Sequence, residues 1–299
     1  MSSAWIIFAF LTAILVSASS LVEKKTLFKQ HALEFSATLS IYTLILSIPF
    51  WFLADFKSIS LTAIGLIYIA SLLGAIAFLL IAKALRHIEI SLTSPFLVFE
   101  PAMVAIFAAI LLKERIAGLQ VAGIAVLIVG AYILNSHQHD HFFEPFKHIA
   151  RSKYIKYILL ALVIYALDSI LDKRIVGAPV DGGLGVSVWA FMALVHFFLA
   201  INYILIMIFF SNGLAGIGKG IKTGGWLVFC VAVLTIGYRL CQMYTISLPG
   251  VMISLVIPIK RLSVLFSTVI GGELFHEHQV LRKALACTIM IIGAILIVM

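Results

Sequence analysis

The chain has few charged residues. Asp, Glu, Lys and Arg together make up 11% of its 299 residues, whereas 63% are hydrophobic. A soluble domain carries about a quarter charged residues. So little polar surface cannot cover one apolar core in water, which excludes an ordinary water-soluble fold. A lipid bilayer is therefore the solvent that this composition requires.

Cysteine is also scarce. Cys230, Cys241 and Cys287 all lie in apolar runs, without the spacing of a disulfide framework or of a metal site. No Ser/His/Asp set and no pair of carboxylates has the spacing of a catalytic site. We therefore expect no enzymatic activity, no cofactor and no bound metal. The net charge of +8 comes from predicted loops and not from the basic face of a soluble module, so we expect no nucleic-acid partner.

Long apolar runs are abundant. A helix needs about 20 such residues to cross a bilayer. Backbone groups in lipid must be hydrogen-bonded within the span, and no alternating barrel pattern appears. We predict an all-α membrane protein with ten transmembrane helices, at residues 4–22, 33–54, 61–82, 90–112, 116–134, 155–175, 186–210, 224–246, 250–272 and 281–299.

The two halves of the chain resemble each other. Glu114 precedes an apolar run that ends at Gly130, Glu277 precedes one that ends at Gly293, and the spacing from Glu to Gly is 16 residues in both. Residues 20–25 also match residues 169–174, with a shift of 149.

This duplication divides the chain into a first five-helix repeat at 1–134, a polar linker at 135–154 and a second five-helix repeat at 155–299. An odd number of helices per repeat makes the two repeats inverted in the membrane. Such duplication indicates a secondary transporter, with its substrate site between the repeats near mid-membrane.

The orientation follows from loop charges. Thirteen Lys and Arg residues lie in the loops after odd-numbered spans and five in the loops after even-numbered spans. By the positive-inside rule, this distribution places both termini outside.

Ionisable residues inside spans are costly and usually face a cavity or a partner. Six stand out: Glu100, Asp168, His196, Arg239, Lys260 and Arg261. Without the histidine, the sum is two negative and three positive charges. The centre is then short of one negative charge, which an anionic or zwitterionic ligand would supply.

The partners of these groups are open to alternatives. Glu100 and Lys260 occupy nearly equivalent places in the two repeats, so we expect them to pair, with Glu100 either a counter-ion or a proton-coupling carboxylate. Lys260 and Arg261 point about 100° apart on a helix. One of them can reach the cavity while the other pairs with Asp168 or a backbone carbonyl. Asp168 is either the partner of Arg239 or a contact for a substrate amine.

Polar residues without charge complete the candidate set. Tyr238 and Gln242 lie at positions i and i+4, on one face of their helix. Tyr42, Tyr68 and Ser94 can likewise line a cavity. His196 is expected to be a hydrogen-bonded bundle residue. At matched helix ends, Lys24 and Lys173 are expected to extend to the membrane interface. The predicted substrate-binding residues are Lys260, Arg261, Arg239, Tyr238, Glu100, Asp168, Gln242, Ser94 and Tyr68.

Over nearly its whole length the chain resembles the EamA-type proteins of the drug/metabolite transporter superfamily. The resemblance rests on the turn at 113–115, the glycine-spaced helix that follows, and their counterparts at 277–293. It implies ten helices in two inverted repeats, alternating access around a central cavity, and coupling to protons. It also implies cytoplasmic termini, against the loop count.

A narrower similarity involves Lys260 and Arg261, which resemble a Lys-Arg pair of the triose-phosphate/phosphate translocators. That resemblance implies that they bind a substrate anion and that Tyr238 matches a tyrosine of that branch. Glu100 stands where that branch has a lysine, which favours a carboxylate or zwitterion over phosphate.

The predicted function is therefore secondary active transport, as an exporter or exchanger, of a small anionic or zwitterionic metabolite such as an amino acid or organic acid. We expect an inner-membrane, multi-pass protein that is a monomer or homodimer. The alternatives are a passive channel, a lipid scramblase or an organic-phosphate antiporter. Bending is expected at Pro95, Pro101, Pro249 and Pro258.

Overall fold

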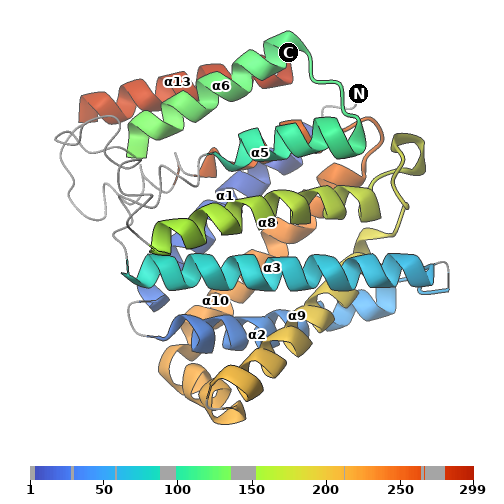
Figure 1. Ribbon diagram of the computed structural model, residues 1–299, viewed down its shortest axis with the longest axis vertical. Helices are drawn as coiled ribbons and strands as arrows, with labels where there is room; N and C mark the ends of the chain where they lie inside the picture. The colour runs from blue at the N-terminus through green and yellow to red at the C-terminus, as the bar shows by residue number, and fades with distance from the viewer. Residues whose placement is uncertain are drawn as a thin grey trace.

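The computed structural model describes residues 4–27, 30–57, 59–87, 99–135, 153–211, 213–263, 266 and 280–299. Over these residues every regular element is a helix (Figure 1). In chain order they are α1 (Ala4–Leu27), α2 (Ala32–Leu53), α3 (Leu61–His87), α5 (Glu100–Phe107) with its π-helical continuation η1 (Ala108–Leu112), α6 (Gly118–Asn135), α8 (Lys153–Val176), the short 3₁₀ helix η2 (Pro179–Asp181), α9 (Val188–Phe210), α10 (Leu214–Ser247), α11 (Ile253–Lys260) and α13 (Val280–Val298).

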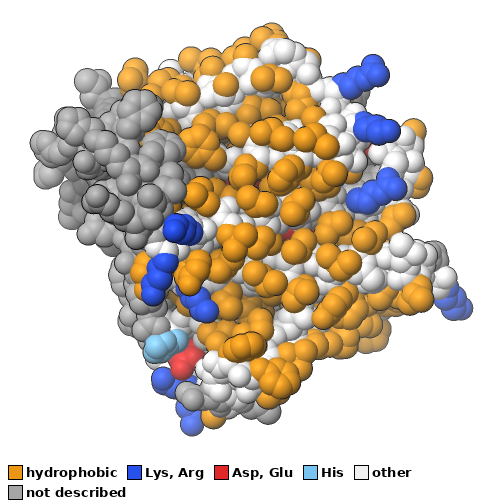
Figure 2. Space-filling model, in the orientation of Figure 1, with side chains coloured by type: hydrophobic (Ala, Val, Ile, Leu, Met, Phe, Trp, Pro, Cys, Tyr) orange, Lys and Arg blue, Asp and Glu red, His pale blue; other side chains and the backbone are white. Residues whose placement is uncertain are grey.

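Six of these helices, α1, α2, α3, α8, α9 and α10, are long and apolar enough to cross a membrane. Figure 2 shows hydrophobic side chains over the middle of one face, with Lys and Arg side chains gathered towards its edges. The protein is therefore an integral multi-pass membrane protein. A helix overlaps each of the ten predicted segments, but α5 with η1, α6, α11 and α13 are not among the six helices that meet this criterion.

Several boundaries differ from the prediction. α1 ends at Leu27 and not at 22, and α3 ends at His87 and not at 82. α10 begins at Leu214 and not at 224, because its glycine-rich first turns pack closely on α2. The side-chain amide of Gln30 donates to the carbonyl of Gly220 at 2.7 Å. This contact overrides the low helix propensity of glycine. The predicted start of the helix at 90–112 is not tested, because the structure describes this segment only from Phe99, and Pro95 and Ser94 lie outside the described residues.

The helices pack in a two-fold pattern. α1 lies on α10, and α8 lies on α3. In the same way α2 contacts α10, and α9 contacts α3. When each helix is replaced by its equivalent in the other half, the α1–α10 contact becomes α8–α3 and the α2–α10 contact becomes α9–α3. The equivalent helices α2 and α9 run in opposite directions, as do α6 and α13 (Figure 1).

The contact between α6 and α13 follows the same two-fold pattern at the level of single residues. A Cβ atom on Gly293 would lie 2.6 Å from the backbone nitrogen of Leu127, and one on Gly130 would lie 2.9 Å from the backbone nitrogen of Met290. A shift of 163 residues along the chain maps each contact onto the other. Small residues allow this close approach of two helix backbones in a membrane.

We predict that Gly293→Ala destabilises the protein by about 1–3 kcal/mol, because the added methyl meets backbone atoms that cannot move without separating the helices. Thermal unfolding in detergent measures the loss. Gly65→Ala in α3 is the control, since a Cβ there meets nothing within 4 Å. An equal melting temperature for both variants would contradict this account of the α6–α13 contact.

Candidate functional site

A group of ionisable side chains lies inside the helix bundle. Asp168 and Asp172 extend from α8, Arg239 from α10 and Lys260 from α11. Asp168 is 6% exposed and Asp172 is 1% exposed. Each of the four charges acts electrostatically on others of the group, and Glu23 of α1 acts on Tyr238 beside them. We call these five charged residues the polar centre.

Arg239 is bound to Asp172. Its Nη1 lies 3.1 Å from Asp172 Oδ2, and the exposed fractions of the two side chains are 17% and 1%. The guanidinium also lies 6.0 Å from the ring centroid of Phe191. The alternative in which Asp168 pairs with Arg239 is therefore wrong. Asp168 and Asp172 are four residues apart on one face of α8, and the arginine contacts the second of them.

Among the described residues, three members of the centre have no ion-pair partner: Asp168, Lys260 and Glu23, whereas Asp172 and Arg239 pair with each other. The structure's described part holds no carboxylate within 4.0 Å of the Lys260 ammonium, and the nearest ring is that of Tyr238, with its centroid 6.0 Å away. The Oδ1 atom of Asp168 is buried without a hydrogen-bond partner there. Asp168 is negative and Lys260 is positive, and both belong to the polar centre.

Glu100 is ion-paired with Arg261, which lies just beyond the end of α11. We expected Glu100 to pair with Lys260, but its partner is the next residue, Arg261. Consecutive residues leave a helix about 100° apart, so Lys260 and Arg261 contact different neighbours. Arg261 faces the first turn of α5, and Lys260 faces α10. Glu100 thus holds the position of a counter-ion.

The expected charge balance also needs correction. Glu23 and Asp172 were absent from the count made on the sequence. With them, the described centre and the neighbouring ion pair hold four carboxylates, at positions 23, 100, 168 and 172, against three cations, at 239, 260 and 261. The predicted shortage of one negative charge disappears. An anion is no longer required by charge counting.

The uncharged candidates divide into two groups. Tyr238 lies beside Lys260, and Gln242 is 1% exposed with an Oε1 atom that has no hydrogen-bond partner among described residues. By contrast, Tyr68 is 40% exposed and packs on Phe198, with 5.4 Å between ring centroids. Tyr42 packs edge-on against Phe229. The structure therefore does not bring Tyr68 and Tyr42 to the polar centre.

His196 and Lys173 have structural partners. His196 is buried, and its Nδ1 lies 2.7 Å from the carbonyl oxygen of Met192, as expected for a bundle histidine. Lys173, predicted to extend to the membrane interface, is buried at the end of α8. Its buried ammonium donates to the carbonyl of Ile246 at 3.0 Å and lies 3.6 Å from Asp181. The side chain of Lys24 lies outside the described residues.

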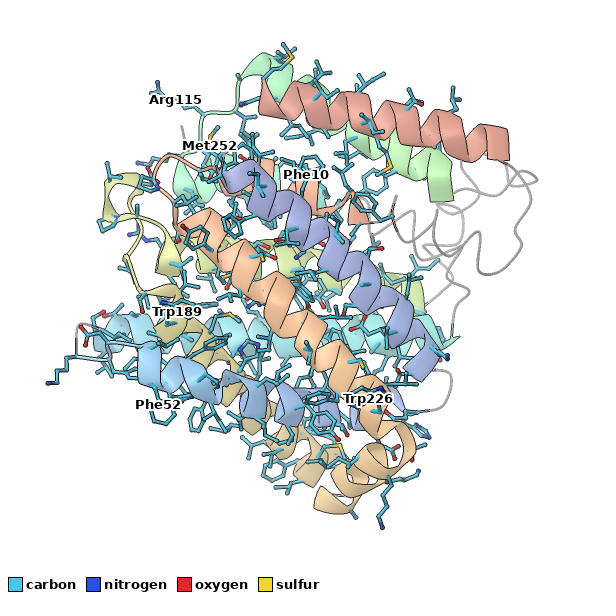
Figure 3. The ribbon with its side chains drawn as sticks, turned by 180° about the vertical axis from the view of Figure 1, so that it is seen from behind. Phe10, Phe52, Arg115, Trp189, Trp226 and Met252 are labelled. Atoms are coloured by element: carbon cyan, nitrogen blue, oxygen red, sulfur yellow. The ribbon has the colours of Figure 1, made fainter. Side chains whose placement is uncertain are left out.

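The helix ends on one side of the bundle are tied together. The turns at 113–117, 177–187 and 248–252 meet there, and we call this side the Glu114 end. The Glu114 carboxylate accepts hydrogen bonds from the N–H groups of Ile253 and Ser254, at 2.9 and 3.2 Å. A hollow of about 180 Å³ lies between the turns. Figure 3 shows Arg115 and Met252 at this end and Trp226 at the opposite one.

Three groups were missed by sequence reasoning or given another role. Asp172 and Glu23 were used only to align the repeats, and Glu114 only to mark a turn. A signal for Asp172 was present, because it follows Asp168 by four residues on the same helix face. The contact of Glu114 with α11 joins positions 139 and 140 residues apart, and local spacing gives no sign of it.

A comparison with known protein families finds a match for the first half of the chain. Residues 3–136 match the model of the EamA-like transporter family. This match confirms the resemblance inferred from the sequence, and it covers the first half of the chain. EamA-like proteins are membrane transporters of the drug/metabolite transporter superfamily. The similarity of Lys260 and Arg261 to the triose-phosphate/phosphate translocators stays a prediction.

One solved structure, described as "Crystal structure of protein", has a TM-score of 0.73 with 15% sequence identity. The alignment covers 99% of this chain and 96% of that one. At this identity the likeness shows a common fold over both halves and nothing about substrate. A search of the curated proteins found no match.

We predict opposite effects for the two aspartates of α8. Asp172→Asn breaks a buried ion pair and should destabilise the protein by about 3 kcal/mol. Asp168→Asn removes a buried charge that has no ion-pair partner, so stability should stay equal or rise. Thermal unfolding of both variants in the same detergent tests this. A larger loss for Asp168→Asn than for Asp172→Asn would show that the assigned pairing is wrong.

Proposed function

We propose that this protein is a secondary active transporter of a small zwitterionic metabolite, such as an amino acid. The observation that carries the proposal is the pair of opposite charges on Asp168 and Lys260, neither of which has an ion-pair partner among the described residues. Both lie near the Arg239–Asp172 ion pair, inside a bundle that is apolar outside. A substrate amine would bind the aspartate, and a substrate carboxylate would bind the lysine.

The energetic argument concerns the cost of an unpaired charge in a membrane. Burying an ionised group without a partner is strongly unfavourable, and such groups in membrane proteins usually serve a ligand or a pathway. Arg239 and Arg261 are already neutralised by carboxylates. Asp168 and Lys260 have opposite signs, so a ligand that carries both charges provides each of them with a partner. This favours a zwitterion over a simple anion or an organic phosphate.

The transport mechanism that we propose is alternating access between inverted repeats at residues 1–134 and 155–299. The two-fold packing of the helices and the opposite directions of equivalent helices support it. α11 is only eight residues long and contains Pro258, while Pro101 lies in the first turn of α5. Short helices with proline at such positions are suitable places for bending.

The proposal extends to location and topology. We place the protein in the inner cell membrane with cytoplasmic termini, as the superfamily resemblance implies. Coupling to protons remains part of the proposal. A passive channel or a lipid scramblase differs from this carrier in kinetics, because only a carrier is accelerated by substrate on the far side.

We predict that purified protein in proteoliposomes takes up at least one of a panel of radiolabelled L-α-amino acids, with saturation and with acceleration by internal substrate. Lys260→Gln and Asp168→Asn should each reduce uptake by at least tenfold, because each removes one of the two charges that bind the zwitterion. Thermal unfolding checks that both variants remain folded.

Tyr68→Phe serves as the matched control, because Tyr68 lies on the exposed surface away from the polar centre. Uptake by this variant should equal that of the unaltered protein. Undiminished uptake by both Lys260→Gln and Asp168→Asn would refute the site. Uptake of organic acids or sugar phosphates without any amino acid would refute the zwitterion.

A further inference from the structure

α11 begins without a polar cap of its own. Its N-cap residue is Met252, whose side chain makes no capping hydrogen bond. The first N–H groups of a helix have no partner within the helix and must find one elsewhere. Here Glu114 supplies it, accepting from the N–H groups of Ile253 and Ser254 and from the Ser254 hydroxyl at 2.5 Å. The cap of a helix in the second half of the chain therefore comes from the first half.

The turn that carries Glu114 is built to hold it in this place. η1 ends at Leu112, and Lys113 follows with a φ of 58°, in the left-handed region. A residue with a Cβ pays about 1–2 kcal/mol for that conformation. The N–H groups of both Lys113 and Glu114 donate to the carbonyl of Ala108. The backbone thereby turns at Lys113 and brings the next side chain to α11.

A second carboxylate holds the same segment. Asp181, in the turn after α8, accepts a hydrogen bond from the N–H of Gly250 at 2.8 Å. Lys173 ties Asp181 to the carbonyl of Ile246 at the end of α10. The α10–α11 turn is thus fixed by Glu114 on one side and Asp181 on the other. Val251 lies between these contacts, is buried, and lines the hollow at this end.

A second hollow, of about 220 Å³, lies at the opposite end of the bundle, and its lining includes Thr26 of α1 and Trp226 of α10. α1 and α10 pack along each other, and α1 also contacts α11. The two hollows are therefore joined by a continuous path of packed helices. A movement of α11 at one end has a direct mechanical route to the other.

We propose that Glu114 and Asp181 are the latches of a gate, and that their release from the α10–α11 turn opens the Glu114 end while the opposite end closes. This inference rests on the proposed transport function, because only a carrier requires such an exchange. Glu114 acts through α11, which carries Lys260 at its far end, so it is a positioning residue and does not touch substrate. No contact with a ligand is needed for the latch itself.

The experiment uses single reporter cysteines in the full-length protein, with Cys230, Cys241 and Cys287 replaced by alanine. Val251→Cys reports on the Glu114 end, and Thr26→Cys reports on the opposite end. Both residues are buried. The labelling rate with a small, charged methanethiosulfonate is measured in detergent without any substrate. Each reporter is combined separately with Glu114→Ala, with Asp181→Asn and with Arg115→Ala.

We expect Glu114→Ala to raise the labelling rate at Val251→Cys by at least tenfold and to lower the rate at Thr26→Cys. Asp181→Asn should shift both rates in the same directions by a smaller factor. Arg115→Ala is the matched control: its side chain is exposed in the same turn, and the variant should change neither rate. A purely structural role for Glu114 would loosen the bundle and raise labelling at both reporters.

Two results would overturn the gate. One is labelling that rises at both reporters, which is the mark of general loosening. The other is an unchanged rate at Val251→Cys in Asp181→Asn, a variant that loses the charge facing Lys173 and keeps only a weaker, neutral acceptor for the Gly250 N–H. This variant still decides the matter if Glu114→Ala fails to fold. Because the labelling needs no substrate, its failure is distinct from a failure of amino-acid uptake, which would refute the proposed function instead.

Discussion

Inside a bilayer no water is at hand to satisfy a buried charge or a free N–H group, and this constraint governs the whole structure. Arg239 and Arg261 each find a carboxylate, and the first N–H groups of α11 find Glu114. Every one of these partners comes from a different helix or turn. The unpaired groups Asp168 and Lys260 then become conspicuous, because the surrounding protein satisfies its other interior cations so consistently.

The same constraint makes the two halves of the chain depend on each other. The principal neighbours of α1 and α2 include α10, and those of α8 and α9 include α3. Asp172 and Arg239 join helices within the second half, whereas Glu100 and Glu114 reach from the first half to the two ends of α11. α11 is thereby held at both ends by acidic residues of the other half. That position suits an element whose movement must be coordinated between the halves.

The sequence predicted the helices well because long apolar runs leave few alternatives in a membrane. It failed where distant contacts decide the outcome. The glycine-rich composition at the start of α10 alone opposes a helix there. α10 nevertheless extends to Leu214 because this part packs against α2. The partner of Glu100 is one residue further along the chain than the expected Lys260, and the partner of Arg239 is one helical turn beyond Asp168. Hydropathy predicts where a helix lies but not how it is rotated about its axis. The hydrogen bond from Lys173 to the carbonyl of Ile246 spans 73 residues, so local spacing gave no sign of it.

The contact between α6 and α13 bears on biosynthesis. α13 follows α6 by more than 140 residues along the chain, and Gly293 lies five residues before α13 ends at Val298. α6 makes its most extensive packing with α13, through backbone atoms that approach within reach of Gly130 and Gly293. During translation α6 therefore enters the bilayer long before its neighbour exists. The seam between the two helices closes only after α13 has been synthesised, so a truncation that removes α13 leaves the first half with an unmatched glycine face.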